Sequence, residues 1–150
     1  MDVKQHTLST LAVGHSERFT RQIGPGDVDR FTELSGDVSP VHTSPAYAAA
    51  KGFGAPIAHG MLLGACVSAL VGNLLPGQHG ILQSCELEFR APLIPPDQIE
   101  VVGEVVSISE STGQVTLKVT IKNGAGRLLV SGRVKSIVRL PNDTATENPS

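Results

Sequence analysis

Hydrophobic and polar residues follow two different periods in the two halves of the chain. Between residues 24 and 36, Val28, Phe31 and Leu34 recur every three positions, and Gly36 follows. This spacing places the three side chains on one face of a helix, and a glycine is the usual residue just past a helix end. The pattern therefore predicts a helix that ends at Gly36.

Two more helices are predicted before residue 76. In the segment 43–52, Ser44 is a good N-cap, Pro45 suits the first helical position and Gly52 follows the last turn. The segment from about residue 60 to residue 75 is apolar on nearly every side. Such a helix must be covered by protein on most of its surface.

The second half of the chain alternates with the period of β-strands. Residues 115–121 place valine, leucine and isoleucine at every second position, between threonine and lysine. Together with a short strand near 16–20, the pattern predicts strands at 80–90, 98–109, 113–123 and 126–139. A buried helix followed by long antiparallel strands predicts an α+β hot-dog fold, in which a curved antiparallel sheet wraps round a long central helix.

The length and composition fit one globular domain. The chain has 150 residues, of which 40% are hydrophobic and 17% are charged. We expect a flexible N-terminal segment at 1–15, a single domain at 16–140 and a disordered polar tail at 141–150.

Several classes of protein are excluded at this stage. A net charge of −2 and an aromatic content of 3% do not favour nucleic-acid binding. The segment 61–75 is too short to span a bilayer, and the N-terminus lacks a signal-peptide pattern, so we expect no membrane partner and a cytoplasmic protein. The sequence shows no metal-ligand spacing and no nucleotide-binding motif, so we expect no metal and no cofactor. Cys66 and Cys85 are expected to be reduced thiols.

The candidate chemistry lies in the stretch "LSGDVSPVHTSPAYAA" at 34–49. Asp37 and His42 lie on either side of Pro40, so they belong to a loop that folds back on itself. They could form an acid–base pair, or Asp37 could make an Asx-turn beside a half-buried loop histidine.

Small residues also recur every four positions along the central helix, at Gly60, Gly64, Ser68 and Gly72. This stripe could admit a ligand close to the backbone, or it could allow close packing of the sheet on the helix. At the helix start, the N–H of Gly60 can stabilise developing negative charge. An acid, an imidazole and this donor together suit chemistry on a carbonyl compound.

These residues resemble the motif of the MaoC-like (R)-specific enoyl-CoA hydratases. The resemblance covers about residues 28–78 and includes Phe31, "LSGD" at 34–37, "PVH" at 40–42, "PIAHGML" at 56–62 and "LPG" at 75–77. It implies a hot-dog fold and the reversible syn hydration of a trans-2-enoyl-CoA to an (R)-3-hydroxyacyl-CoA.

The resemblance also implies roles for individual residues. Asp37 and His42 would hold and activate one water molecule, and the Gly60 N–H would bind the thioester oxygen. Ser68 would be a supporting hydroxyl beside the aspartate. The loop departs from the family pattern at Ser39, where asparagine is usual, and Ser39 and Pro40 would support the loop.

Three further residues complete the expected substrate site. Val71, about one turn beyond Ser68, is placed to meet the far end of the acyl chain. We also assign His59 and Met61 to substrate binding, although His59 could instead fix the turn before the helix.

Two alternatives to the hydratase remain open. The same residues could serve a dehydratase that acts on 3-hydroxyacyl thioesters of acyl carrier protein, or the domain could bind acyl thioesters without catalysis. A single hot-dog layer leaves a sheet edge open, and the resemblance implies a homodimer.

Overall fold

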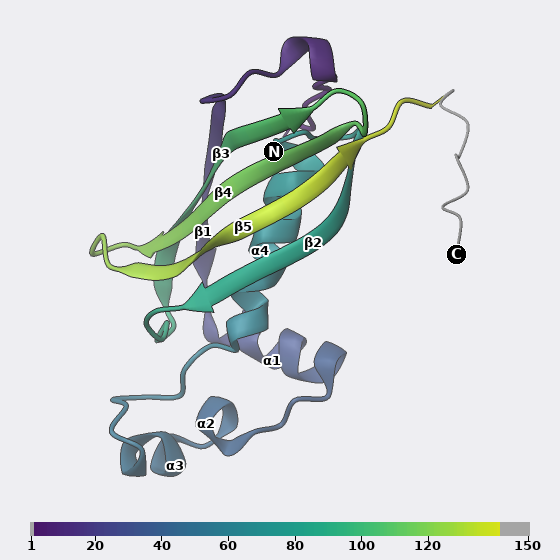
Figure 1. The fold of residues 1–150 in the computed structure, drawn as a ribbon. Coiled ribbons are helices and arrows are strands. Elements are labelled where there is room, and N and C mark those ends of the chain that lie inside the picture. The colour runs from purple at the N-terminus through teal and green to yellow at the C-terminus, as the bar shows by residue number, and fades with distance from the viewer. Residues whose placement is uncertain (1, 142–150) are drawn as a thin grey trace.

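The computed structural model describes residues 2–141, and its centre is one five-stranded antiparallel sheet. The strand order is β1-β3-β4-β5-β2, so β1 and β2 are the edges (Figure 1). The strands are β1 (Ser16–Ile23), β2 (Gly80–Phe89), β3 (Asp97–Ser109), β4 (Gln114–Asn123) and β5 (Leu128–Val138). The four strands predicted after residue 80 are confirmed within two residues at each end, and β1 runs three residues further than expected.

The helices lie before β2 in the chain. They are η1 (Leu8–Thr10), α1 (Pro25–Ser35), α2 (Pro40–Thr43), α3 (Pro45–Ala50) and α4 (Gly60–Asn73). The three predicted helices are confirmed, whereas the short helix α2 was not predicted because its four residues offer no periodicity. Ser44 caps α3 by accepting a hydrogen bond from the N–H of Tyr47, as expected from the sequence.

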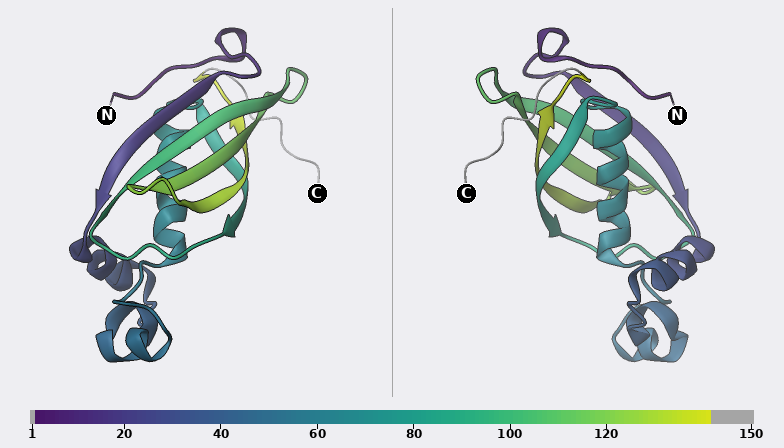
Figure 2. Two further views of the ribbon diagram at one scale, coloured as in Figure 1. Left: turned by 90° about the vertical axis from the view of Figure 1, so that its left-hand side faces the viewer. Right: turned by 90° about the vertical axis from the view of Figure 1, so that its right-hand side faces the viewer.

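Helix α4 lies along the concave side of the sheet, which curves around it (Figure 2). The inward side chains of β4 are fully buried, which confirms the alternation read from the sequence. At Gly103 of β3 an added Cβ would lie 2.5 Å from a methyl group of Leu70. The close approach of helix and sheet therefore depends on a glycine in the sheet. At Gly72, in the small-residue stripe of the helix, an added Cβ would have no neighbour within 4 Å. This is the expected hot-dog fold.

One side of this layer is left uncovered. Along α4 the exposed residues Met61, Ala65, Ser68 and Gly72 form a continuous stripe, which we call the open face. Beside it, edge strand β2 exposes nearly all of its side chains, including Ile81 and Leu82. The central helix is therefore covered by its own chain on only part of its surface, less than its apolar sequence leads one to expect.

The segment before β1, expected to be flexible, is hydrogen-bonded to the end of α4 and the turn that follows it. The Lys4 N–H donates to Asn73 O over 2.7 Å, and the Lys4 carbonyl accepts from the N–H of Gln78 over 2.9 Å. Leu11 is buried in the core. Nearly all of the polar tail expected to be disordered lies outside the described residues. Within those residues, every helix is too short or too polar to cross a membrane.

Candidate active site

The loop between α1 and α2 fixes the carboxylate of Asp37. Gly36 ends α1 with a φ of 73°, a left-handed conformation that favours glycine, and donates its N–H to Thr32 O. The Ser39 N–H then donates to Asp37 Oδ1 over 3.1 Å. The Asx-turn considered from the sequence is therefore present, and it occupies only one of the two carboxylate oxygens.

The other oxygen of Asp37 faces His42. The distance from Asp37 Oδ2 to His42 Nε2 is 3.9 Å, which is too long for a direct hydrogen bond. The side chain of Asp37 is 51% exposed and that of His42 is 12% exposed. The structure thus brings the two residues together at the protein surface, with His42 held in the short helix α2 that begins at Pro40.

A hydrogen bond on the far side of the His42 ring assigns its tautomer. Nδ1 lies 2.8 Å from the carbonyl oxygen of Ile57. A carbonyl only accepts, so Nδ1 carries the hydrogen, and in the neutral ring Nε2 keeps a free lone pair. The lone pair points to the side where Asp37 lies, which is the arrangement a general base requires.

His59 lies behind the pair. It is 2% exposed, its Nε2 donates to the backbone carbonyl of Asp37 over 2.9 Å, and its ring stacks on that of His42 with centroids 3.9 Å apart. The Phe31 ring also packs against His59, with ring centroids 5.1 Å apart. His59 is buried, and its hydrogen bond to Asp37 fits the turn-fixing role considered from the sequence.

Gly60 opens into the same pocket as His42. This pocket, of about 300 Å³, is also lined by Ile57, Leu63 and Phe89. An added Cβ at Gly60 would lie only 3.1 Å from the Phe89 ring. Gly60 is the first residue of α4, and among the described residues its N–H has no hydrogen-bond partner. The pocket therefore combines an imidazole with a free helix N-terminal donor.

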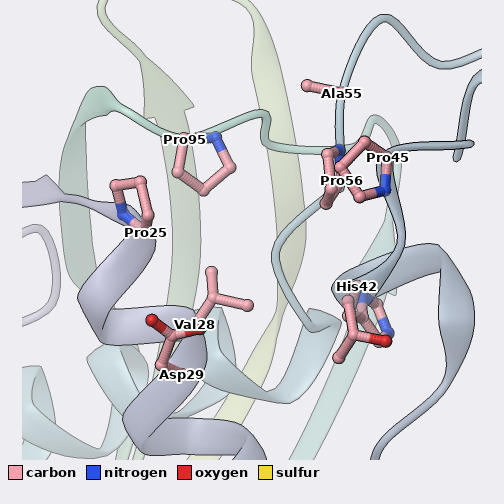
Figure 3. Close-up of a pocket in the computed structure, with 9 residues that line it drawn as sticks. Pro25, Val28, Asp29, His42, Pro45, Ala55, Pro56 and Pro95 are labelled. Atoms are coloured by element: carbon pink, nitrogen blue, oxygen red, sulfur yellow. The ribbon is translucent and has the colours of Figure 1, made fainter.

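A second pocket, of about 250 Å³, lies on the α1 side of His42 (Figure 3). Val28 and Asp29 of α1 line one wall, and Pro45, Ala55 and Pro56 line the wall beside His42. Most of this lining is apolar. His42 thus lines both pockets.

The remaining predicted substrate residues do not line the pocket that holds Gly60. Ser68 and Met61 lie on the open face, and Ser68 is two turns beyond Gly60, about 12 Å along the helix. The role of Ser68 beside Asp37 stays a prediction. Val71 is 2% exposed and belongs to the core, because it faces the sheet while Ser68 faces outward. Within this chain Val71 therefore packs in the core, and its role beside an acyl chain stays a prediction.

The two residues predicted to support the loop, Ser39 and Pro40, contribute in different ways. Pro40 begins α2, as its fixed φ favours. Ser39 contributes through its backbone, because its N–H binds Asp37 and its carbonyl accepts from the N–H of His42 over 2.9 Å. Its side chain makes no capping hydrogen bond.

Two parts of the site were not predicted from the sequence. The Ile57 carbonyl contacts His42, and the Phe89 ring lies against Gly60. A backbone carbonyl leaves no trace in residue type, and Phe89 occupies an ordinary apolar strand position. No signal in one sequence could have found them.

The structure also assembles two groups of potential metal ligands that spacing along the chain did not reveal. One is Asp37, His42 and His59, and the other is His6, His15 and Glu17, each with ligand atoms within 4.8 Å of one another. In the first group, His42 Nδ1 and His59 Nε2 already bind backbone carbonyls.

Comparisons with known proteins identify the family of this chain. The model of the MaoC like domain family matches residues 8–125. The chain belongs to this family.

Individual members of this family resemble the chain over most of its length. The chain is 36% identical to an (R)-specific enoyl-CoA hydratase of Aeromonas caviae over 132 residues, which cover 88% of this chain and 97% of the relative. The solved (R)-hydratase of A. caviae, described as involved in PHA biosynthesis, superposes with a TM-score of 0.82 at 35% identity, covering 86% of this chain and 98% of that one. The unliganded R-hydratase PhaJ1 of Pseudomonas aeruginosa superposes with a TM-score of 0.86 at 32% identity, covering 99% and 97%. The fold and the enzyme class, a hydro-lyase, follow from these likenesses.

Proposed function

We propose that the chain is an (R)-specific enoyl-CoA hydratase, which adds water reversibly to a trans-2-enoyl-CoA to give the (R)-3-hydroxyacyl-CoA. The observation that carries the proposal is the 3.9 Å gap between His42 Nε2 and Asp37 Oδ2, beside the pocket of Gly60. One water oxygen can reach both atoms across such a gap. The substrate class follows the relatives named above.

The roles of the two side chains follow from their hydrogen bonds. The lone pair on His42 Nε2 takes a proton from the water as its oxygen bonds to C3 of the enoyl group. The other hydrogen of the water is held by the Asp37 carboxylate, which also stabilises the imidazolium that forms. His42 then returns the proton to C2 on the same face, so the addition is syn and the enzyme ends unchanged.

The thioester oxygen gains negative charge between these two proton transfers. The Gly60 N–H, at the positive end of α4, is the donor that stabilises this charge. A comparable backbone or side-chain donor contributes roughly 10²–10³-fold to the rate of acyl transfer. The proposed reaction needs no cofactor.

The test is a hydration assay with crotonyl-CoA, followed by chiral analysis of the product. We expect the enoyl absorbance to fall and the product to be the (R)-3-hydroxy thioester. Asp37→Asn, which removes the charge that faces His42, should lose most of this activity. Glu33→Gln, a change on the exposed side of α1, is its matched control and should keep the activity. The absence of turnover in the unmodified protein, or an (S) product, contradicts the proposal.

We also propose that the chain works as a homodimer. The open face of α4 and the edge strand β2 both expose apolar side chains, among them Met61, Ile81 and Leu82. An unpaired edge strand with exposed apolar residues is a template for pairing with another strand. A second copy would extend the sheet through β2 and cover α4.

The oligomeric state can be measured by light scattering after size-exclusion chromatography. Leu82→Lys should convert the dimer to a monomer, because it places a charge on the paired edge. Val13→Lys is the control, since Val13 is also exposed but lies in the loop before β1. A monomeric unmodified protein, or a dimer that Leu82→Lys leaves intact, contradicts this part of the proposal.

A further inference from the structure

A second cluster of titratable side chains lies at the opposite end of the domain from the candidate active site. His6 comes from the N-terminal segment, His15 from the residue before β1 and Glu17 from β1 itself. The N-terminal segment runs past the end of α4, and the loops around α2 lie at the other end of that helix (Figures 1 and 2). The fourteen residues of α4 separate the two clusters by about 20 Å.

The ligand atoms of this cluster converge on one point. His6 Nε2 and His15 Nε2 each lie 3.7 Å from the same oxygen, Glu17 Oε1. The two imidazole rings are perpendicular, at 83°, with centroids 4.7 Å apart. In a tetrahedral zinc site with bonds of about 2.0–2.1 Å, neighbouring ligand atoms are about 3.4 Å apart. The two distances to Glu17 Oε1 exceed this spacing by about 0.3 Å, and all three ligand atoms lie within 4.8 Å of one another.

Two of these side chains are shielded although they are polar. Glu17 shares its side of β1 with Phe19 and Ile23, which face the core, and its side chain is only 22% exposed. His6 Nε2 is buried and has no hydrogen-bond partner among the described residues. A shielded carboxylate and an unpartnered imidazole nitrogen both cost free energy unless something binds them.

The backbone holds the cluster in place without a ligand. The His6 N–H donates to Pro76 O over 3.2 Å, and the carbonyl of His15 accepts from the N–H of Val105 over 2.8 Å. Both histidines therefore approach Glu17 from anchored positions. Such preorganisation lowers the entropy cost of binding an ion.

We propose that His6, His15 and Glu17 form a binding site for a divalent transition-metal cation, of which Zn²⁺ is the best match. Two imidazoles and one carboxylate are the ligand types that Zn²⁺ uses, and a fourth position would remain for water or the second oxygen of Glu17. Bound there, the ion fastens the N-terminal segment to β1 and the end of α4. The site is independent of the hydratase activity.

The primary test is isothermal titration calorimetry of the full, untagged chain with ZnCl₂ after treatment with EDTA. We expect one Zn²⁺ to bind at this site and Glu17→Gln to weaken its affinity at least tenfold. His6→Gln should do the same, so the result does not depend on one variant folding. His79→Gln removes a histidine outside the cluster and should leave the affinity unchanged.

A second variant separates this cluster from the candidate active site. Asp37→Asn alters the other group of potential ligands, and it should retain the Zn²⁺ that Glu17→Gln loses. If no Zn²⁺ binds, or if binding persists in both Glu17→Gln and His6→Gln, the proposal is overturned.

Hydrogen exchange provides a readout that an adventitious surface ion would not change. The amides of Lys4, His6 and Gln78 donate hydrogen bonds that join the N-terminal segment to the end of α4 and the turn that follows it. With ZnCl₂ their exchange should slow at least threefold in the unmodified protein and not in Glu17→Gln. Equal exchange rates with and without Zn²⁺ would overturn the fastening role.

Discussion

His59 Nε2 donates to the backbone carbonyl of Asp37 over 2.9 Å while the His59 ring stacks on that of His42. One buried residue thus positions both members of the proposed catalytic pair. Asp37 in the loop, His42 in α2 and His59 before α4 thus form one contacting unit. The spacing of the three residues along the chain does not predict that His59 contacts the other two.

The first prediction concerns this positioning. His59→Phe keeps a ring against His42 but removes the donor, so Asp37 loses one of its anchors. We expect kcat to fall about five- to tenfold, which corresponds to roughly 1–1.4 kcal/mol, with KM nearly unchanged. His59→Gln, whose amide N–H can reach the position of Nε2, should restore part of the rate. Steady-state kinetics on crotonyl-CoA checks both variants, and full activity in His59→Phe would contradict the role.

The second prediction concerns Asp37 itself. Asp37→Asn keeps the Asx-turn acceptor for the Ser39 N–H but removes the charge that faces His42. We expect kcat to fall by about 10²–10⁴-fold with little change in KM, as for other positioned acid–base groups. Normal turnover in Asp37→Asn would show that Asp37 only shapes the loop.

The third prediction concerns the departure from the family motif. Ser39 supports the loop through its backbone, so Ser39→Asn keeps the existing hydrogen bonds and adds an amide donor. We expect kcat/KM to be equal or higher. A comparison of the two proteins on one enoyl-CoA measures this, and a large loss of activity would mean that the loop requires serine.

The fourth prediction concerns Val71, which the structure places in the core. Val71→Ala removes two methyl groups, each worth about 0.8 kcal/mol of burial, and leaves a cavity, so we expect a loss of about 2 kcal/mol in the free energy of unfolding. The preference among C4, C6 and C8 enoyl-CoAs should not change. Denaturant unfolding and kcat/KM across the three substrates test this together. A shift toward longer chains without loss of stability would restore the substrate role.

The fifth prediction concerns the pH dependence of stability. Asp27 has a pKa below its ordinary value, because its carboxylate accepts the N–H of Gly24 at the start of α1 and lies beside Arg30 and Arg21. A pKa lowered by folding stabilises the protein above the unfolded value, near 3.8, and this contribution is lost as the pH falls through the folded value.

Asp27→Ala should therefore cost about 1 kcal/mol of unfolding free energy at pH 7, the usual value of a helix cap. The difference from the unmodified protein should shrink as the pH falls below about 4. Glu33→Ala, on the exposed side of the same helix, is the control and should show little difference at either pH. A deficit in Asp27→Ala that does not vary with pH would rule out the charge as its source.

The sequence alone determined the order of the main elements and the hot-dog fold. It also indicated that the loop with Asp37 and His42 belongs to one motif with the start of the helix at Gly60. It could do so because periodicity, caps and turn residues act over a few positions. The helix over Gly60–Asn73 and the alternation in β4 are local properties of this kind.

Only the tertiary structure decided which side of α4 is covered and which neighbours complete the site. The apolar sequence of α4 does not distinguish Val71, in the core, from Ser68, on the open face, because the curvature of the sheet sets the difference. The Ile57 carbonyl that assigns the tautomer of His42 lies fifteen residues away from it, and His59 lies twenty-two residues from Asp37. Contacts across such separations depend on how the chain folds back, which one sequence does not record.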